Sequence, residues 1–285
     1  MALSTSVDAA LPSAIRFAEI DWRGRAIRLE YQWVGVADSA YPVVVFLHEG
    51  LGSLAMWKEF PERFCRANGF TGLVFSRYGY GQSTMRPAGE RFPVEFMHIQ
   101  AREMLPAFFR EAGVERPWLF GHSDGASIAL LYGAAFPQAL AGMVVAAPHI
   151  FVEDITLDSI RAARQAFLDT DLPQRLGRYH ADVDSPFWGW NDVWLDPAFR
   201  RWSIEAELNA ISCPVLAVQG EDDEYGTLEQ VHGIKRRLPH AELLVLPQCG
   251  HSAHRDQPQA LTEHAGSFIR HAGAGRTDKP NQAVI

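Results

Sequence analysis

At residues 118–131 the chain reads WLFGHSDGASIALL. The apolar run at 118–120 predicts a buried strand and the pattern at 123–135 predicts a helix, so Ser123 stands where a strand turns abruptly into a helix. Such a turn strains the serine backbone and lifts its hydroxyl clear of the sheet. Glycine is required at Gly121 and Gly125 because a Cβ there would collide with the neighbouring strand or helix. A G-x-S-x-G motif in this setting predicts a nucleophilic serine.

The same alternation of strand and helix continues on both sides of this segment. Short apolar runs predict strands buried on both faces of a parallel sheet, at 43–47, 72–75, 118–120, 143–146, 215–218 and 243–246. Helical patterns lie between them, at 57–67, 96–112, 123–135, 228–238 and 257–272. Upstream, two β-rich segments (15–20 and 26–33) flank a hairpin signal at 21–24. This order predicts an α/β fold with a doubly wound, mostly parallel sheet.

The composition excludes several classes of protein. With 47% hydrophobic and 21% charged residues among 285, the chain is globular rather than disordered. A net charge of −8 argues against a nucleic-acid partner, which requires clustered Lys and Arg. No stretch approaches eighteen apolar residues, so no membrane span is expected, and the first residues lack a secretory signal pattern. Three widely spaced cysteines favour reduced thiols in a cytoplasmic protein.

One segment interrupts the alternation. Between 147 and 215, about sixty residues carry no strand pattern, and an unstructured loop of that length would be unusual. We therefore predict a helical cap at 148–212, inserted into a core formed by 1–147 and 213–272, with a flexible tail at 273–285. Four of the eight tryptophans lie in the cap: Trp188, Trp190, Trp194 and Trp202. These aromatic residues either pack the cap onto the sheet or line a binding site, and both interpretations stay open.

A serine hydroxyl needs a base to act as a nucleophile at neutral pH, and the base needs an orienting acid. Candidates follow two later strands: residues 220–226 read GEDDEYG and residues 249–256 read CGHSAHRD. Because the carboxyl ends of parallel strands meet at one edge of the sheet, we expect these loops to lie near Ser123. The order serine, acid, histidine is the one associated with the G-x-S-x-G turn.

On these motifs the chain resembles the serine-type enzymes of the α/β-hydrolase fold, over residues 42–270. The resemblance implies an eight-stranded sheet with a helical cap, and it implies that Ser123 is the nucleophile. Asp223 corresponds to the acid, since the spacing strand-Gly-x-x-Asp falls there, with Asp222 as the alternative. His251 corresponds to the base because it directly follows a turn glycine, with His254 as the alternative. The stretch SRYGYGQS at 76–83 resembles a structural turn of the family.

The resemblance also implies an oxyanion hole of two backbone N–H groups. One belongs to Asp124, and the other belongs to Gly50 in the loop after the third strand, with Leu51 as the alternative. Two residues depart from the family pattern. Glu49 stands where the family usually has glycine, and Asp124 places a carboxylate beside the nucleophile. The Asp124 side chain either points into a polar cluster away from the site or stabilises the imidazolium form of His251.

The function implied by the resemblance is hydrolysis of a small carboxylic ester through an acyl-enzyme on Ser123. Carbon–carbon hydrolases of vinylogous diketones, thioesterases and lactonases of the family use the same triad, and a non-catalytic ligand-binding homologue is the alternative from another class. Candidate residues of the substrate pocket are Leu51, Trp57, His122, His149, Trp188, Trp190 and Trp194. For Trp57, packing in the core is the alternative.

We expect no cofactor and no metal. The spacing His251-x-x-His254 has no third ligand at a convincing distance, and Gly79-x-Gly81 lacks the third glycine of a dinucleotide-binding turn. The expected partner is a small-molecule ester or a related acyl compound, with no nucleic acid and no membrane.

Overall fold

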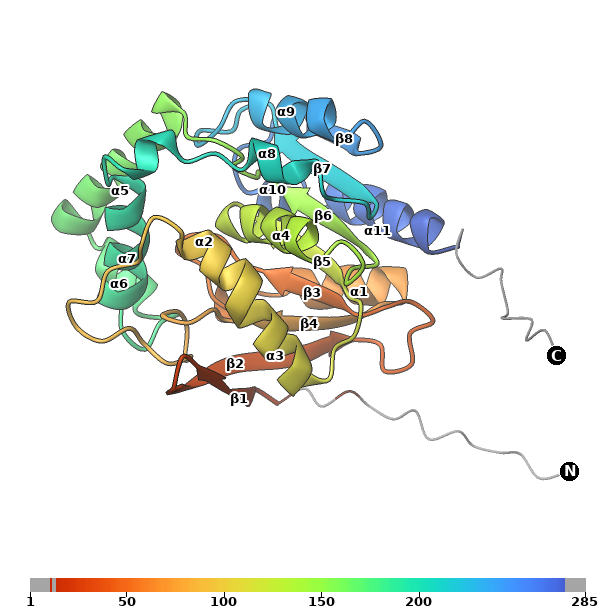
Figure 1. The fold of residues 1–285 in the computed structure, drawn as a ribbon, viewed down its shortest axis with the longest axis horizontal. Helices are drawn as coiled ribbons and strands as arrows, with labels where there is room; N and C mark the ends of the chain where they lie inside the picture. Colours follow the sequence, from red (N-terminus) through yellow and green to blue (C-terminus); the bar gives the residue numbers. More distant parts are fainter. Residues whose placement is uncertain (1–10, 12–13, 275–285) are drawn as a thin grey trace, which may run out of the picture.

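The computed structural model describes residue 11 and residues 14–274. Its centre is one sheet of eight strands in the order β1-β2-β4-β3-β5-β6-β7-β8 (Figure 1). The pairs β1–β2 and β2–β4 are antiparallel. The other five pairs of neighbouring strands, β4–β3, β3–β5, β5–β6, β6–β7 and β7–β8, are parallel. The predicted doubly wound, mostly parallel sheet is therefore confirmed. The strands are β1 (Arg16–Trp22), β2 (Arg25–Gly35), β3 (Val44–Leu47), β4 (Thr71–Phe75), β5 (Trp118–His122), β6 (Gly142–Ala146), β7 (Val215–Gly220) and β8 (Glu242–Leu246).

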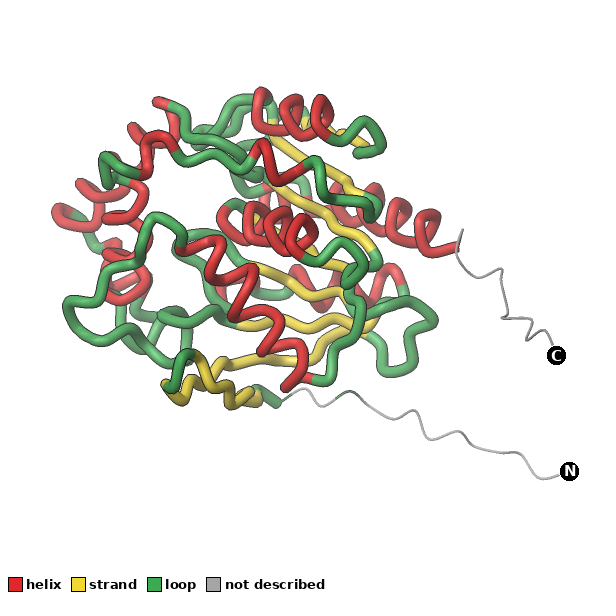
Figure 2. Tube along the Cα trace, in the orientation of Figure 1, coloured by secondary structure: helices red, strands yellow, loops and turns green. Residues whose placement is uncertain are grey.

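Helices cover both faces of the sheet (Figure 2). Alternate residues of a strand point to opposite faces, so Val45 and Leu47 join one core cluster while Val44 and Phe46 join the other. The first cluster includes residues of α3 (Leu105–Ala112), α4 (Asp124–Ala135) and α9 (Glu229–Arg237). The second includes residues of α1 (Phe60–Asn68) and α11 (Pro258–Ala274). Burial on both faces explains why the parallel strands are uniformly apolar.

The segment between β6 and β7 is helical. It contains α5 (Asp154–Asp169), α6 (Leu172–Leu176), α7 (Asp184–Trp194) and α8 (Glu205–Leu208). The first three lie together beyond one end of the sheet, whereas α8 packs on α4 and α9 (Figure 1). This arrangement supports a helical cap, and the boundaries at 148 and 212 stay a prediction.

Two predicted helices differ in detail from those observed. The helix expected at 96–112 is divided into α2 (Phe96–Ile99), a π-helical turn at Gln100–Met104 and α3. Pro106 explains this interruption of the α-helix. Proline has no N–H to donate to the carbonyl four residues earlier, and its ring would clash with that carbonyl in a regular α-helix. The helix expected at 57–67 begins at Phe60, after Lys58, whose φ of 51° interrupts the helix.

The last helix, α11, includes Gly273 and Ala274, the first two residues of the predicted tail. The rest of that tail lies outside the described residues. Cys65, Cys213 and Cys249 are buried and form no disulfide bond with one another. Within the part of the chain that the structure describes, no helix is long and apolar enough to cross a membrane.

Candidate active site

Ser123 lies at the turn between β5 and α4, as predicted. Its φ of 54° and ψ of −121° are a strained conformation for a residue with a side chain. The turn is tight because α4 packs directly on β3: a Cβ added to Gly125 would lie 2.2 Å from the carbonyl oxygen of Leu47. The serine is therefore held at the carboxyl end of β5, with 7% of its surface exposed.

His251 stands between Ser123 and Asp223. Its Nε2 is 2.9 Å from Ser123 Oγ, and its Nδ1 is 2.8 Å from Asp223 Oδ1. The three residues follow β5, β7 and β8, whose carboxyl ends share one edge of the sheet. All three are buried. Such a chain of carboxylate, imidazole and hydroxyl is able to take a proton from the serine as the oxygen attacks an electrophile.

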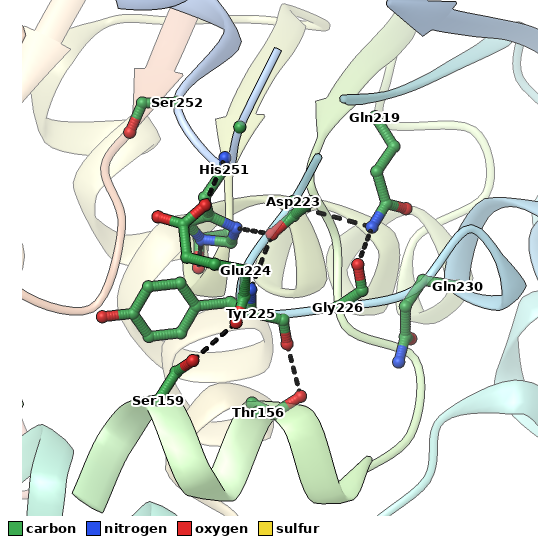
Figure 3. A network of polar contacts seen from close by, with 12 residues as sticks. Thr156, Ser159, Gln219, Asp223, Glu224, Tyr225, Gly226, Gln230, His251 and Ser252 are labelled. Atoms are coloured by element: carbon green, nitrogen blue, oxygen red, sulfur yellow. Dashed lines mark hydrogen bonds and ion pairs between the residues drawn. The ribbon is translucent and has the colours of Figure 1, made fainter. Parts of the chain in front are cut away.

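Asp223 is held in its charged form by several donors (Figure 3). Its Oδ1 also accepts the N–H of Tyr225 at 2.8 Å, and its Oδ2 accepts Gln219 Nε2 at 3.2 Å. Burial alone raises the pKa of this carboxyl, but the hydrogen bond and charge of His251, with the Tyr225 N–H, hold the pKa below its ordinary value. The carboxylate thus keeps the proton on Nδ1 and leaves the lone pair of Nε2 for Ser123.

Helix α5 supports the loop that carries Asp223, and Figure 3 shows it directly beside this loop. Thr156 Oγ1 and Ser159 Oγ each donate to a loop carbonyl at 2.5 Å, those of Tyr225 and Glu224 respectively. The Glu224 carboxylate accepts the backbone N–H of His251 at 3.0 Å. These supporting residues were not predicted from the sequence. The only signal was the carboxylate-rich turn itself, since nothing local points to α5.

The two alternative residues of the sequence analysis have other surroundings. Asp222 is exposed, and its backbone N–H donates to the carbonyl of Cys249 at 2.9 Å. The His254 ring packs against the rings of Trp57 and His122, each at 4.9 Å between centroids. Burial lowers the pKa of His254 to about 3, so this ring is neutral. The geometry therefore favours Asp223 and His251.

A sequence profile described as "Alpha/beta hydrolase family" matches residues 44–264. The chain belongs to this family. It is 25% identical over 274 residues to the serine hydrolase BPHL of Homo sapiens, covering 92% of this chain and 89% of that protein. A 2-hydroxy-6-oxo-6-phenylhexa-2,4-dienoate hydrolase of Comamonas testosteroni is 28% identical over 187 residues, covering 55% of this chain and 64% of the relative.

Among solved structures, a thermophilic esterase from Thermogutta terrifontis shares the fold with a TM-score of 0.67 at 18% identity, over 91% of this chain and 99% of that one. Membership of the family, with relatives named as hydrolases, supports hydrolase activity for this chain.

In this alpha/beta hydrolase, residues of the segment between β6 and β7 contact the loop after β3. Trp190 of α7 lies against Gly50, because a Cβ added to the glycine would be 2.2 Å from the indole nitrogen. The carbonyl of Leu51 lies 3.0 Å from His180 Nε2. The N–H of Asp124 lies in the first turn of α4, where N–H groups have no acceptor within the helix. The N–H groups of Gly50 and Asp124 stay the predicted oxyanion donors.

The Asp124 side chain is fully buried in the hydrolase. Its Oδ1 accepts Trp194 Nε1 at 3.2 Å, and within the described residues its Oδ2 has no hydrogen-bond partner. Burial raises the pKa of Asp124 to about 6, although Arg77, the Trp194 hydrogen bond and His251 act in the opposite direction. The carboxyl group is therefore buried against Trp194, and the charge of His251 acts to lower its pKa. Which of the two predicted roles of Asp124 holds stays a prediction.

The other pocket candidates separate into two groups. His149 is near the site, with its ring 5.0 Å from that of Trp194 and 5.9 Å from that of His251. Trp57 lies in the core cluster on the α1 side of the sheet, and Trp188 donates to Asp184 Oδ1 on the cap. These positions favour packing for both residues, which is the alternative left open by the sequence. Within residues 11 and 14–274, no group of three or more His, Cys, Asp or Glu side chains is arranged to hold a metal ion.

Proposed function

We propose that this protein is a serine hydrolase that cleaves small carboxylic esters through an acyl-enzyme on Ser123. The observation that supports the proposal is the continuous chain from Asp223 through His251 to Ser123, at 2.8 and 2.9 Å. The strained backbone of Ser123 adds support, because strain of this kind is characteristic of a nucleophile held at a strand-to-helix turn.

In the proposed reaction, Ser123 Oγ attacks the carbonyl carbon of the ester while His251 Nε2 takes the hydroxyl proton. Asp223 stabilises the imidazolium that forms. The carbonyl oxygen becomes an oxyanion, stabilised by the N–H groups of Gly50 and Asp124. Collapse of this intermediate breaks the bond to the alcohol, which receives the proton from His251. Water then attacks the acyl-enzyme by the same sequence, releasing the acid and restoring the serine.

The cap is proposed to exclude water and shape the substrate pocket. Trp190 beside Gly50 and Trp194 beside Asp124 are the aromatic residues that we assign to this pocket, with Leu51 and His149. Their positions against the two predicted oxyanion donors support this assignment.

A carbon–carbon hydrolase is the second candidate function. It is favoured by the similarity to the Comamonas testosteroni relative, whose name describes such a substrate. The same three residues would serve either reaction, so the choice depends on the substrate rather than on the triad.

A fluorophosphonate probe and a substrate panel test the proposal. The panel contains short p-nitrophenyl esters, aryl esters, lactones, acyl thioesters and a vinylogous diketone. We expect the wild type and the control Ser212→Ala to be labelled and to hydrolyse esters, and Ser123→Ala to do neither. Turnover of the diketone alone would favour the second candidate. A folded wild type that neither reacts with the probe nor hydrolyses any member of the panel would refute a hydrolytic function.

A further inference from the structure

His180, from the segment between β6 and β7, joins two loops at the edge of the sheet. It lies between α6 and α7 and is buried. Its Nδ1 accepts the backbone N–H of Gly81 at 3.0 Å, and its Nε2 lies 3.0 Å from the backbone carbonyl oxygen of Leu51. Next to it, the N–H of Ala181 donates to the carbonyl of Gly81 at 2.8 Å. The ring is therefore held between the loop after β3 and the loop after β4.

These partners fix the place of the proton on the His180 ring. The nitrogen that accepts the Gly81 N–H must carry a lone pair, and a neutral imidazole then carries its proton on the other nitrogen. Burial lowers the pKa of His180, which favours the neutral form, although the hydrogen bond with Leu51 and the charge of Glu49 act in the opposite direction. The titratable groups that act on this ring or contact it are Glu49, His48 and Tyr80. Nε2–H of His180 therefore donates to the Leu51 carbonyl.

Two peptide groups connect this bond to the predicted oxyanion donor. The peptide group between Leu51 and Gly52 accepts the proton of His180 Nε2 at its oxygen, and its N–H donates to the carbonyl of Glu49 at 3.1 Å. That carbonyl belongs to the peptide group whose N–H is the Gly50 donor. A peptide group whose carbonyl accepts a hydrogen bond is polarised and becomes a better donor, so each bond in the chain orients and strengthens the next.

Other contacts of the same chain come from the loops after β3 and β4. The Glu49 carbonyl also accepts Arg77 Nη2 at 2.7 Å and faces His48 Nδ1 at 2.8 Å. The N–H of Leu54 donates to Ser76 Oγ at 2.8 Å. His180 differs from these partners because it comes from the segment between β6 and β7. The position of the Gly50 N–H therefore depends on how that segment lies on the loop after β3.

We propose that His180 is a positioning residue, which orients the predicted oxyanion donor, the N–H of Gly50, through these two peptide groups. This inference rests on the proposed function. In this role His180 does not touch the reacting atoms. It acts through the backbone of residues 49–52, so the segment between β6 and β7 contributes to the oxyanion hole as well as to the substrate pocket.

Two substitutions separate the two hydrogen bonds of His180. In His180→Asn, the amide oxygen takes the place of Nδ1, so the bond from Gly81 is kept and the donor to Leu51 is lost. In His180→Gln, the amide N–H takes the place of Nε2, so the donor to Leu51 is kept. We expect kcat for the best ester of the panel to fall by about tenfold in His180→Asn and to stay within about threefold of the wild type in His180→Gln. KM should change little, because the oxyanion exists only after the attack on the carbonyl.

His240→Asn is the matched control. His240 Nε2 lies 3.1 Å from the carbonyl oxygen of Cys213, a contact of the same kind at the amino ends of β7 and β8, opposite the site. This variant should keep the kcat of the wild type. A merely structural role of His180 would make kcat follow the thermal stability of the two variants. Equal kcat in folded His180→Asn and His180→Gln, or a raised KM with unaltered kcat in His180→Asn, would overturn the proposal.

Nuclear magnetic resonance of protein labelled with ¹⁵N-histidine tests the hydrogen-bond chain without any activity. The His180 ring is assigned by the signals that are missing from His180→Asn. At pH 6 we expect this ring to be neutral with its proton on Nε2, whereas an ordinary histidine is mostly charged at that pH. A charged ring at pH 6, or a proton on Nδ1, would contradict the chain. If the wild type hydrolyses nothing in the panel, the proposed function fails and the role of His180 in catalysis fails with it, while the resonance result still decides whether the chain exists.

Discussion

Replacement of Gly125 by alanine is expected to remove most of the hydrolytic activity without unfolding the protein. The added Cβ would lie 2.2 Å from the carbonyl oxygen of Leu47 and 2.7 Å from that of His48. Ordinary carbon–oxygen contacts are about 3.3 Å or longer, so α4 must move away from β3 by about 1 Å. Ser123 and Asp124 lie at the start of α4 and move with it, whereas His251 belongs to another loop.

A displacement of this size costs about 100-fold in rate for a reaction that depends on alignment. This loss corresponds to about 2.7 kcal/mol of transition-state stabilisation. The overpacked contact should lower the free energy of unfolding by about 1–3 kcal/mol, which a chain of this size tolerates. The measurements are kcat/KM with the best ester of the panel and thermal unfolding of the same preparations.

Gly113→Ala is the matched control. Gly113 has a φ of +66° and no heavy atom within 4 Å of an added Cβ, so alanine there strains the backbone by about 1 kcal/mol without a clash. This control should lose stability and keep its kcat/KM. The reasoning is refuted if folded Gly125→Ala retains kcat/KM close to that of the wild type, or if the control loses as much activity.

Two further predictions concern the buried carboxylates. Asp223→Asn should lower kcat by about 10⁴-fold, since an amide no longer fixes the proton on Nδ1 of His251. Because the pKa of Asp223 is below its ordinary value, the carboxylate stabilises the fold at neutral pH, and this contribution disappears on acidification. Urea unfolding should therefore show that Asp223→Asn loses less stability than the wild type between pH 6 and pH 3. Asp124 is the opposite case, because burial raises its pKa from 3.8 to about 6. The stability lost by ionising this carboxyl therefore grows as the pH rises above 3.8 and is complete above about pH 6. Asp124→Asn should therefore be more stable than the wild type at pH 7.5, by up to about 3 kcal/mol, and this difference should vanish below about pH 4. In the pH–rate profile of the same variant, an unchanged acid limb would reject coupling of Asp124 to His251.

Much of the fold was predictable because its signals are local. The apolar strands are short and uniformly buried, so their hydrophobic runs identified them without any knowledge of their neighbours. The turn at Ser123 was predictable for the same reason, since the two glycines and the flanking patterns lie within a few residues of it. The π-helical turn at Gln100–Met104 was missed although its cause, Pro106, is visible in the sequence. A proline predicts a disturbed helix, but not the form of the disturbance.

The pairing of side chains across the site was beyond the sequence. Glu49 meets His122 and Trp194 meets Asp124, in each case across about seventy residues of chain. The carboxylate-rich turn contained Asp223, but its contacts with Thr156 and Ser159 of α5 depend on how the cap lies on the core.

The amino-acid sequence by itself determined the alternation of strands and helices, the strained serine turn and the order in which serine, acid and histidine occur. These are consequences of spacing along the chain. The tertiary structure alone decided which aspartate and which histidine lie in line with Ser123, and which tryptophans come from the cap to the site. Such choices depend on distances of a few ångströms between loops of different strands, and those distances are set by the sheet order and by packing of the cap.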